Sequence, residues 1–131
     1  MKKSLFKEKY GPYALVAGGS DGFGFAFAEA VARRGLNLVL IARQEDRLHA
    51  AAERLKAAYH IDVIAIAADM ADFEQVEKRI SALPVSIGFL IYNAAFAPIG
   101  RFDNTSGEHL AIAVAVHVKA PLLLSSCSPR L

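Results

Sequence analysis

Residues able to bind a phosphate-bearing ligand occur at four places in this chain, each directly after a short apolar run. The places are Gly18 to Gly24 (GGSDGFG), Arg43, Asp69-Met70 and Asn93-Ala94-Ala95. Glycines let the backbone turn tightly and approach a ligand closely. A helix that starts from such a turn points free N–H groups and the positive end of its dipole at an anion, most naturally a pyrophosphate. The chemistry indicated is therefore nucleotide binding.

Strands and helices must bring these places together, and the hydrophobic pattern predicts where they lie. Continuous apolar runs predict strands over 12–18, 37–42, 62–68 and 87–92. Helical spacing predicts helices over 22–34, 44–58, from Phe73 after an Asp72 cap, and from about Gly107. Gly35 is a candidate cap at the end of the first of these helices.

The alternation of strands and helices predicts a doubly wound α/β sheet that resembles the Rossmann fold. The connections are too short for anything but parallel pairing of the strands. Ligands bind such sheets at the carboxyl ends of the strands, where the strand order reverses. All four places identified above fall at those ends, which favours a binding site over a glycine turn that merely connects two elements.

The composition is that of one globular domain. Of the 131 residues, 54% are hydrophobic and 21% are charged. A formal net charge of +2 gives no reason to expect a nucleic-acid partner. Part of the basic excess lies in the first residues, so we expect a solvated leader over 1–11 that is not a signal peptide. The predicted dinucleotide-binding domain covers 12–125, and an irregular tail covers 126–131.

The expected environment is a reducing cytoplasm, without a membrane span or a metal site. The single cysteine, Cys127, cannot form an internal disulfide. The most apolar late segment is interrupted by His117, Lys119 and Pro121, which argues against a span.

The residues after the second predicted strand favour NADP(H) over NAD(H). A fold that prefers NAD usually places a carboxylate there, but this chain has Ala42 followed by Arg43. A guanidinium can bind a 2′-phosphate through two hydrogen bonds, and Ser20 can donate another. The alternative is that Arg43 is a solvated surface residue, either unpaired or paired with Glu45 or Asp46. Asp69 can accept from the adenine amino group, cap the following turn, or do both.

Taken together, these residues resemble the short-chain dehydrogenase/reductase family over about residues 10 to 124. Ala17 to Gly24 is similar to the family's T-G-x-x-x-G-x-G turn, with Ala17 in place of threonine and Phe23 where isoleucine is common. Arg43 with Arg47-Leu48 is similar to NADP-preferring members, Asp69-Met70 to the adenine-contacting pair, and Asn93-Ala94-Ala95 to the N-A-G motif. The resemblance implies hydride transfer between NADPH and a carbonyl or alcohol substrate.

The chain departs from the family in the residues that carry the chemistry. The family uses a serine and a Tyr-x-x-x-Lys pair, and none of the tyrosines here has a lysine four residues later: Tyr10, Tyr13, Tyr59 and Tyr92. His117 aligns with the helix asparagine of the family's tetrad. The chain stops before a fifth strand, so we expect a truncated Rossmann-like fold that has no catalytic residues of its own and is catalytically incompetent alone.

Two other functions remain to be weighed. The helix over 107–124 is apolar on nearly all sides, so the chain is alternatively a non-catalytic nucleotide-binding or protein-interaction module, or a homo-oligomer joined through that helix. A methyltransferase shares the α/β layout, but its cofactor's ribose also needs an acid after the second strand, where Ala42-Arg43 offers none.

Overall fold

Four apolar runs form the strands of one parallel sheet in a computed structural model that describes residues 2–127. The strands are β1 (Tyr13–Ala17), β2 (Asn37–Ala42), β3 (Val63–Ala67) and β4 (Ile87–Tyr92). Their order across the sheet is β3-β2-β1-β4, with every neighbouring pair parallel. This confirms the predicted doubly wound α/β sheet, and β1 and β4 flank the point where the strand order reverses.

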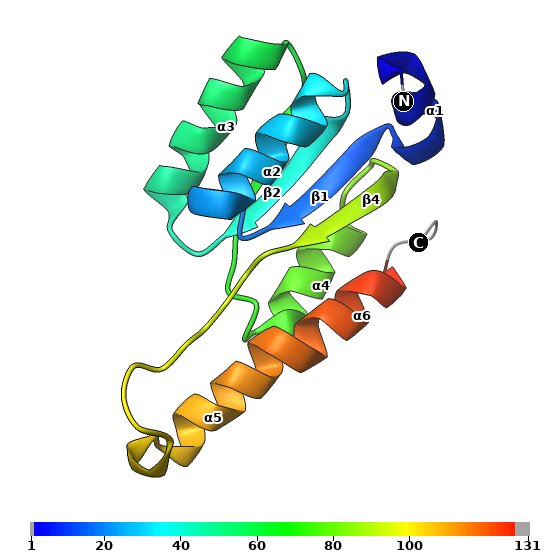
Figure 1. Cartoon of the computed structure of the whole chain (residues 1–131). Helices are drawn as coiled ribbons and strands as arrows, with labels where there is room; N and C mark the ends of the chain where they lie inside the picture. The colour runs from blue at the N-terminus through cyan, green and yellow to red at the C-terminus, as the bar shows by residue number, and fades with distance from the viewer. Residues whose placement is uncertain (1, 128–131) are drawn as a thin grey trace.

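The helices cover both faces of this sheet (Figure 1). On one face lie α2 (Gly22–Arg33) and α3 (Glu45–Tyr59). On the other lie α4 (Phe73–Ser81) and the end of a long helical run. That run consists of α5 (Gly107–Val114), the π-helical turn η2 (Ala115–Lys119) and α6 (Ala120–Cys127), and a short 3₁₀ turn, η1 (Phe102–Asn104), precedes it. In Figure 1, α5 extends past the carboxyl ends of the strands.

Alternate strand residues enter separate cores on the two faces, as the pleat of a strand requires. Val16 and Leu40 pack with the residues of α2 and α3. Leu15 and Ile41 pack with α4 and with Leu124 of α6. Burial on both faces explains why each strand is a continuous apolar run rather than an alternating one.

The first residues, where the sequence predicts a solvated leader over 1–11, form a helix that has no buried residue. Helix α1 (Lys3–Tyr10) packs beside β4. The rings of Phe6 and Tyr10 lie 5.7 and 5.2 Å from the ring of Phe89 on β4. Phe6 and Tyr10 are four residues apart, so a single helical face presents both rings to the sheet. The lysines of this segment are exposed, as predicted.

Two predicted end signals are confirmed and two are corrected. Gly35 follows α2 and donates its N–H to the Ala32 carbonyl, which confirms the cap. Asp72 occupies the N-cap position of α4 but makes no capping hydrogen bond through its side chain. Instead, Asp69 Oδ1 accepts from the Ala71 N–H at 2.9 Å and closes the turn before α4. Helix α6 continues through Cys127, so residues 126–127 are not irregular, and the rest of the expected tail lies outside the described residues.

The helical run Gly107–Cys127 is long and apolar enough, by length and composition, to cross a membrane. Of its most apolar stretch of 18 residues, 17% is buried. One such helix is weak evidence for a membrane span, because the core helix of a soluble protein can be equally long and apolar. Here Val116, Ala120 and Leu124 are buried in the core beside α4. The expectation that the chain has no membrane span stays a prediction.

The π turn η2 leaves a backbone carbonyl that a side chain of β4 satisfies. The Ala120 N–H donates to the carbonyl of Ala115 instead of that of Val116. In the same pattern the Val116 carbonyl would accept from residue 121, which is a proline without an N–H. The hydroxyl of Tyr92, at the end of β4, donates to this carbonyl. Burial, followed by the nearby Asp69 carboxylate, raises the pKa of Tyr92 to about 12.

Replacing Tyr92→Phe is expected to lower the free energy of unfolding by about 1–3 kcal/mol, because it leaves the Val116 carbonyl without a donor. In the wild type, the raised pKa of Tyr92 contributes to the free energy of unfolding. This contribution is complete below pH 10 and is lost as the pH rises toward 12. Urea unfolding at pH 8 and pH 11 measures both effects. We expect the variant to lose less stability between the two pH values, and an equal loss would contradict the assignment. Tyr59→Phe, whose hydroxyl contacts the Glu29 carboxylate, is the control.

The start of α2 lies directly against the turn that leaves β1. A Cβ on Gly24 would be 1.7 Å from the carbonyl oxygen of Gly18, which is far inside van der Waals contact with a backbone atom. Only glycine fits at this position, and α2 therefore begins directly above the end of β1.

Gly24→Ala is expected to destabilise the fold by more than about 2 kcal/mol, because backbone must move to admit the methyl group. Gly107→Ala, at the first residue of α5, has no heavy atom within 4 Å of the added Cβ and is the matched control. We expect it to be neutral or slightly stabilising, since alanine favours helix. Equal unfolding midpoints for the two variants would refute the packing argument.

Candidate functional site

A cavity of about 240 Å³ opens at the carboxyl ends of the strands. The turns after all four strands contribute to its wall: Gly18, Ser20 and Asp21 after β1, Arg43, Gln44 and Arg47 after β2, Ala68, Asp69 and Met70 after β3, and Asn93, Ala94, Ala95 and Phe96 after β4. Ile41, Ala42, Ile112 and Val116 complete it. The cavity therefore lies where a doubly wound sheet binds its ligands.

Backbone hydrogen bonds fix the turns that form this wall. The Gly18 N–H donates to the Ile41 carbonyl at 2.7 Å, and the Asn93 N–H donates to the Ala17 carbonyl at 2.8 Å. These bonds continue the ladders of β1 with β2 and with β4 past the ends of the strands. They hold the turns after β1 and β4 against the end of the sheet.

The structure brings most of the predicted residues to the cavity wall. Gly18, Ser20, Asp21, Arg43, Asp69, Met70, Asn93, Ala94 and Ala95 all contribute to it. Gly22, Phe23 and Gly24 do not: Gly24 is buried behind Gly18, and the side chain of Phe23 is 80% exposed. Gly22 has a left-handed φ of +54°, and the direction in which a Cβ would project is open.

Some wall residues were not identified from the sequence. Gln44 and Phe96 directly follow predicted residues, Arg43 and Ala95, so the rule that ligands bind at the carboxyl ends of strands could have identified them. The sequence connects Arg47 with a cofactor only through the likeness of Arg43 and Arg47-Leu48 to NADP-preferring members of the family. Ile112 and Val116 come from the distant helical run, and no local signal marks them as wall residues.

Arg43 is an exposed cation without an ion pair among residues 2–127. Its exposure agrees with the expected alternative of a solvated surface arginine, but the pairing with Glu45 or Asp46 that could accompany it is not found: Glu45 Oε1 lies 3.6 Å from Nε2 of His49 instead. Arg47 does have a partner, because its Nη1 lies 3.3 Å from Oδ2 of Asp21. The wall thus carries two guanidinium groups and one carboxylate within its first two turns.

His117 holds the segment that follows β4. Its Nε2 lies 3.1 Å from the backbone nitrogen of Phe96 and 2.9 Å from the carbonyl oxygen of the same residue. The neutral ring accepts from the N–H in one tautomer and donates to the carbonyl in the other. The ring of Phe96 also packs edge-on against that of His109, at 5.8 Å. His117, whose role the sequence left open, therefore fixes one side of the cavity wall.

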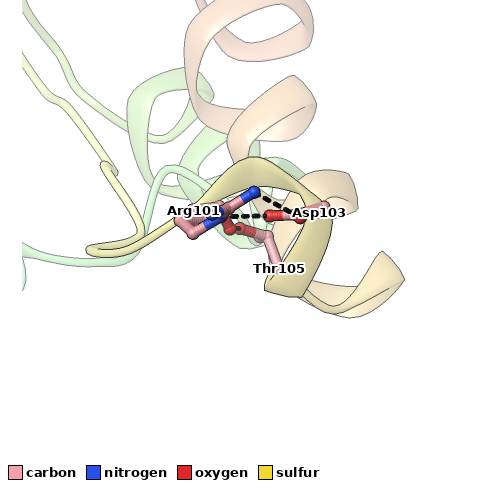
Figure 2. Close-up of polar contacts among 3 residues, drawn as sticks. All are labelled: Arg101, Asp103 and Thr105. Carbon is pink, nitrogen blue, oxygen red and sulfur yellow. Dashed lines mark hydrogen bonds and ion pairs between the residues drawn. The ribbon is translucent and has the colours of Figure 1, made fainter.

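Arg101, in the loop between β4 and α5, binds a carboxylate of its own loop. Figure 2 shows Arg101 bound by both oxygens of Asp103, at 3.0 and 2.9 Å, while Thr105 Oγ1 donates to the Arg101 carbonyl at 3.0 Å. Both partners lie in the same tight turn, which includes η1. The charge of Arg101 is satisfied locally, and this residue does not contribute to the cavity wall.

Chemically, the wall suits a ligand that carries phosphate and an amino-bearing base. Two guanidinium groups can bind phosphate. The Asp69 carboxylate accepts one hydrogen bond from the Ala71 N–H and can accept further hydrogen bonds from a ligand. Among the described residues, no group of three His, Cys, Asp or Glu side chains is placed to hold a metal ion.

Known proteins with similar sequences and structures are dehydrogenases and reductases. The chain is 32% identical over 113 residues to a 7beta-hydroxysteroid dehydrogenase of Mediterraneibacter gnavus, covering 86% of this chain and 43% of that protein. It is 31% identical over 121 residues to the human inactive hydroxysteroid dehydrogenase-like protein 1, covering 89% of this chain and 37% of that protein. The chain thus spans less than half the length of these relatives.

A solved structure shows the same relation. A short-chain dehydrogenase from Sphingobium yanoikuyae in complex with NADPH superposes with a TM-score of 0.80 at 36% identity, covering 88% of this chain and 46% of that one. The family model described as short chain dehydrogenase matches residues 12–128. The match includes the glycine turn, all four strands and the cavity wall, and on this ground the chain belongs to the short-chain dehydrogenase family.

Proposed function

We propose that this chain is the NADP(H)-binding part of an oxidoreductase that transfers hydride between NADPH and a carbonyl or alcohol substrate. The observation that carries the proposal is the position of Arg43, an exposed cation beside the cavity at the switch point of the sheet. NADPH in the solved complex of the Sphingobium yanoikuyae relative supports it.

The residues of the wall fit such a cofactor. Gly22 leaves open space where a side chain would block a ligand approaching the start of α2, whose N–H groups can bind the pyrophosphate. Arg43 would hold the 2′-phosphate and Asp69 the adenine amino group. Asn93, Ala94 and Ala95 would border the rest of the dinucleotide. The bound cofactor supplies the hydride, and this chain's residues bind and orient it.

We further propose that the 131-residue chain does not complete the reaction by itself. Proton exchange with a substrate oxygen needs a group whose pKa lies near the working pH. Tyr92 lies beside the cavity, but its hydroxyl donates to the Val116 carbonyl and its pKa is raised to about 12. No tyrosine of this chain has a lysine four residues later to lower its pKa. The proton-transfer groups would then come from outside this chain.

A second candidate is a non-catalytic module that docks on a partner through the last helical run. The side chains of Val114, Val118 and Leu122 are 58, 51 and 69% exposed, which is unusual for apolar residues on adjacent helical turns. This candidate would be favoured if the chain bound neither NADPH nor NADH and instead associated with itself or with a partner protein. Saturable NADPH binding would favour the first.

Arg43→Asp is expected to move the cofactor preference from NADPH toward NADH, because a carboxylate repels the 2′-phosphate and can accept from ribose hydroxyls. The loss of a charge-assisted contact corresponds to roughly a tenfold or greater rise in the NADPH Kd. Calorimetric titration with both nucleotides measures the change. Arg79→Asp, on α4 and away from the cavity, makes the same change in net charge as a control. An unchanged preference would show that Arg43 does not bind the phosphate.

Gly22→Val is expected to abolish nucleotide binding while leaving the helical content similar, because the side chain would occupy the open approach to α2. In the wild type, a ligand at about a hundred times its Kd should add roughly 2.7 kcal/mol of stability, so a thermal-shift titration with NADPH reads out binding. Gly100→Val is the matched control, since Gly100 also has a positive φ, +125°, and open space, but lies in the loop between β4 and η1 and not at the start of α2. If Gly22→Val bound NADPH with wild-type affinity, the glycine turn would be only a connection between β1 and α2.

A further inference from the structure

We propose that Arg47 is a second specificity-determining residue for the 2′-phosphate, and that Asp21 restrains it through their ion pair. The proposal rests on the proposed NADP(H) function and concerns the same cavity. It assigns a role to a contact between two turns that lie far apart in the sequence.

Arg47 lies on the same side of the cavity as Arg43. Arg43 follows β2 directly, and Arg47 lies in the first turn of α3, which begins at Glu45. Both contribute to the cavity wall. A phosphate held by Arg43 at the end of β2 would therefore have a second guanidinium one helical turn away, and two guanidinium groups bind a dianion better than one.

Asp21 holds the Arg47 side chain toward the other turn of the wall. Oδ2 of Asp21 lies 3.3 Å from Nη1 of Arg47, across the gap between the β1–α2 and β2–α3 turns. Asp21 is at the N-cap position of α2, yet its side chain accepts no capping hydrogen bond there. The contact thus directs the carboxylate at Arg47 and leaves the first N–H groups of α2 to a ligand.

The ion pair is weak enough to be exchanged for a phosphate. The side chains of Arg47 and Asp21 are 65% and 67% exposed, so solvent screens their attraction. A 2′-phosphate carries more charge than a carboxylate and offers three acceptor oxygens. For Arg47 to bind the phosphate, its contact with Asp21 must first break. Asp21 therefore lowers the selectivity that Arg43 and Arg47 would give together.

The test is a double-mutant cycle on the whole chain, with Kd values for NADPH and NADH from calorimetric titration. Asp21→Asn keeps the shape of the side chain and removes its charge. We expect it to raise the ratio of the NADH Kd to the NADPH Kd by about two- to fivefold, the range that an exposed ion pair can supply. In an Arg47→Gln background, the same substitution should leave the ratio unchanged.

A control separates the specific contact from a general effect of charge. Asp46→Asn removes one negative charge from the same turn of α3, but Asp46 has no ion pair with Arg47. We expect it to leave the ratio near the wild-type value. An equal rise in Asp46→Asn, or a rise in Asp21→Asn that persists without Arg47, would overturn the inference.

The outcomes also distinguish this inference from the proposed function. Wild-type binding of NADPH with a ratio that Asp21→Asn does not change would overturn the restraint by Asp21, and an unchanged NADPH Kd in Arg47→Gln would overturn the role of Arg47, in both cases without touching the proposed function. A wild-type chain that binds neither nucleotide would overturn the proposed function, and the inference with it. A lower NADPH affinity in Arg47→Gln, with NADH affinity retained, would support both.

Discussion

The site depends on one close contact, between the α-carbon of Gly24 and the carbonyl of Gly18. Because no side chain separates them, α2 begins directly above the end of β1. Asp21, which directly precedes this helix, then contributes to the cavity wall and lies within reach of Arg47. A bulkier residue at position 24 would push the helix away from the strand and move every group that the turn carries.

Much of the fold followed from the sequence because parallel strands buried on both faces are continuous apolar runs. β2 and β4 have the predicted bounds, and β1 and β3 are one residue shorter at each end. The site followed from the fold, since the carboxyl ends of parallel strands meet at one edge. Arg43, Asp69 and Asn93 needed no tertiary information beyond that rule.

The missed features are contacts between side chains and distant segments. Asp21 and Arg47 are 26 residues apart, and Phe96 and His117 are 21 apart. Which rotamer each side chain adopts depends on packing that no local pattern encodes. Helix α1 was missed for a related reason. Its lysines indicate a solvated segment, whereas the aromatic face of Phe6 and Tyr10 acquires meaning only beside Phe89.

The position of β4 in the sheet has a consequence for how the cavity can be extended. Among the described strands β4 pairs only with β1, so its other side is an edge. Its sequence, IGFLIY, has none of the charges or prolines that usually protect an edge from pairing. A strand added there in parallel would continue the sheet and bring its own carboxyl end beside Asn93. The wall of the cavity would then gain a fifth turn, on the side away from Arg43.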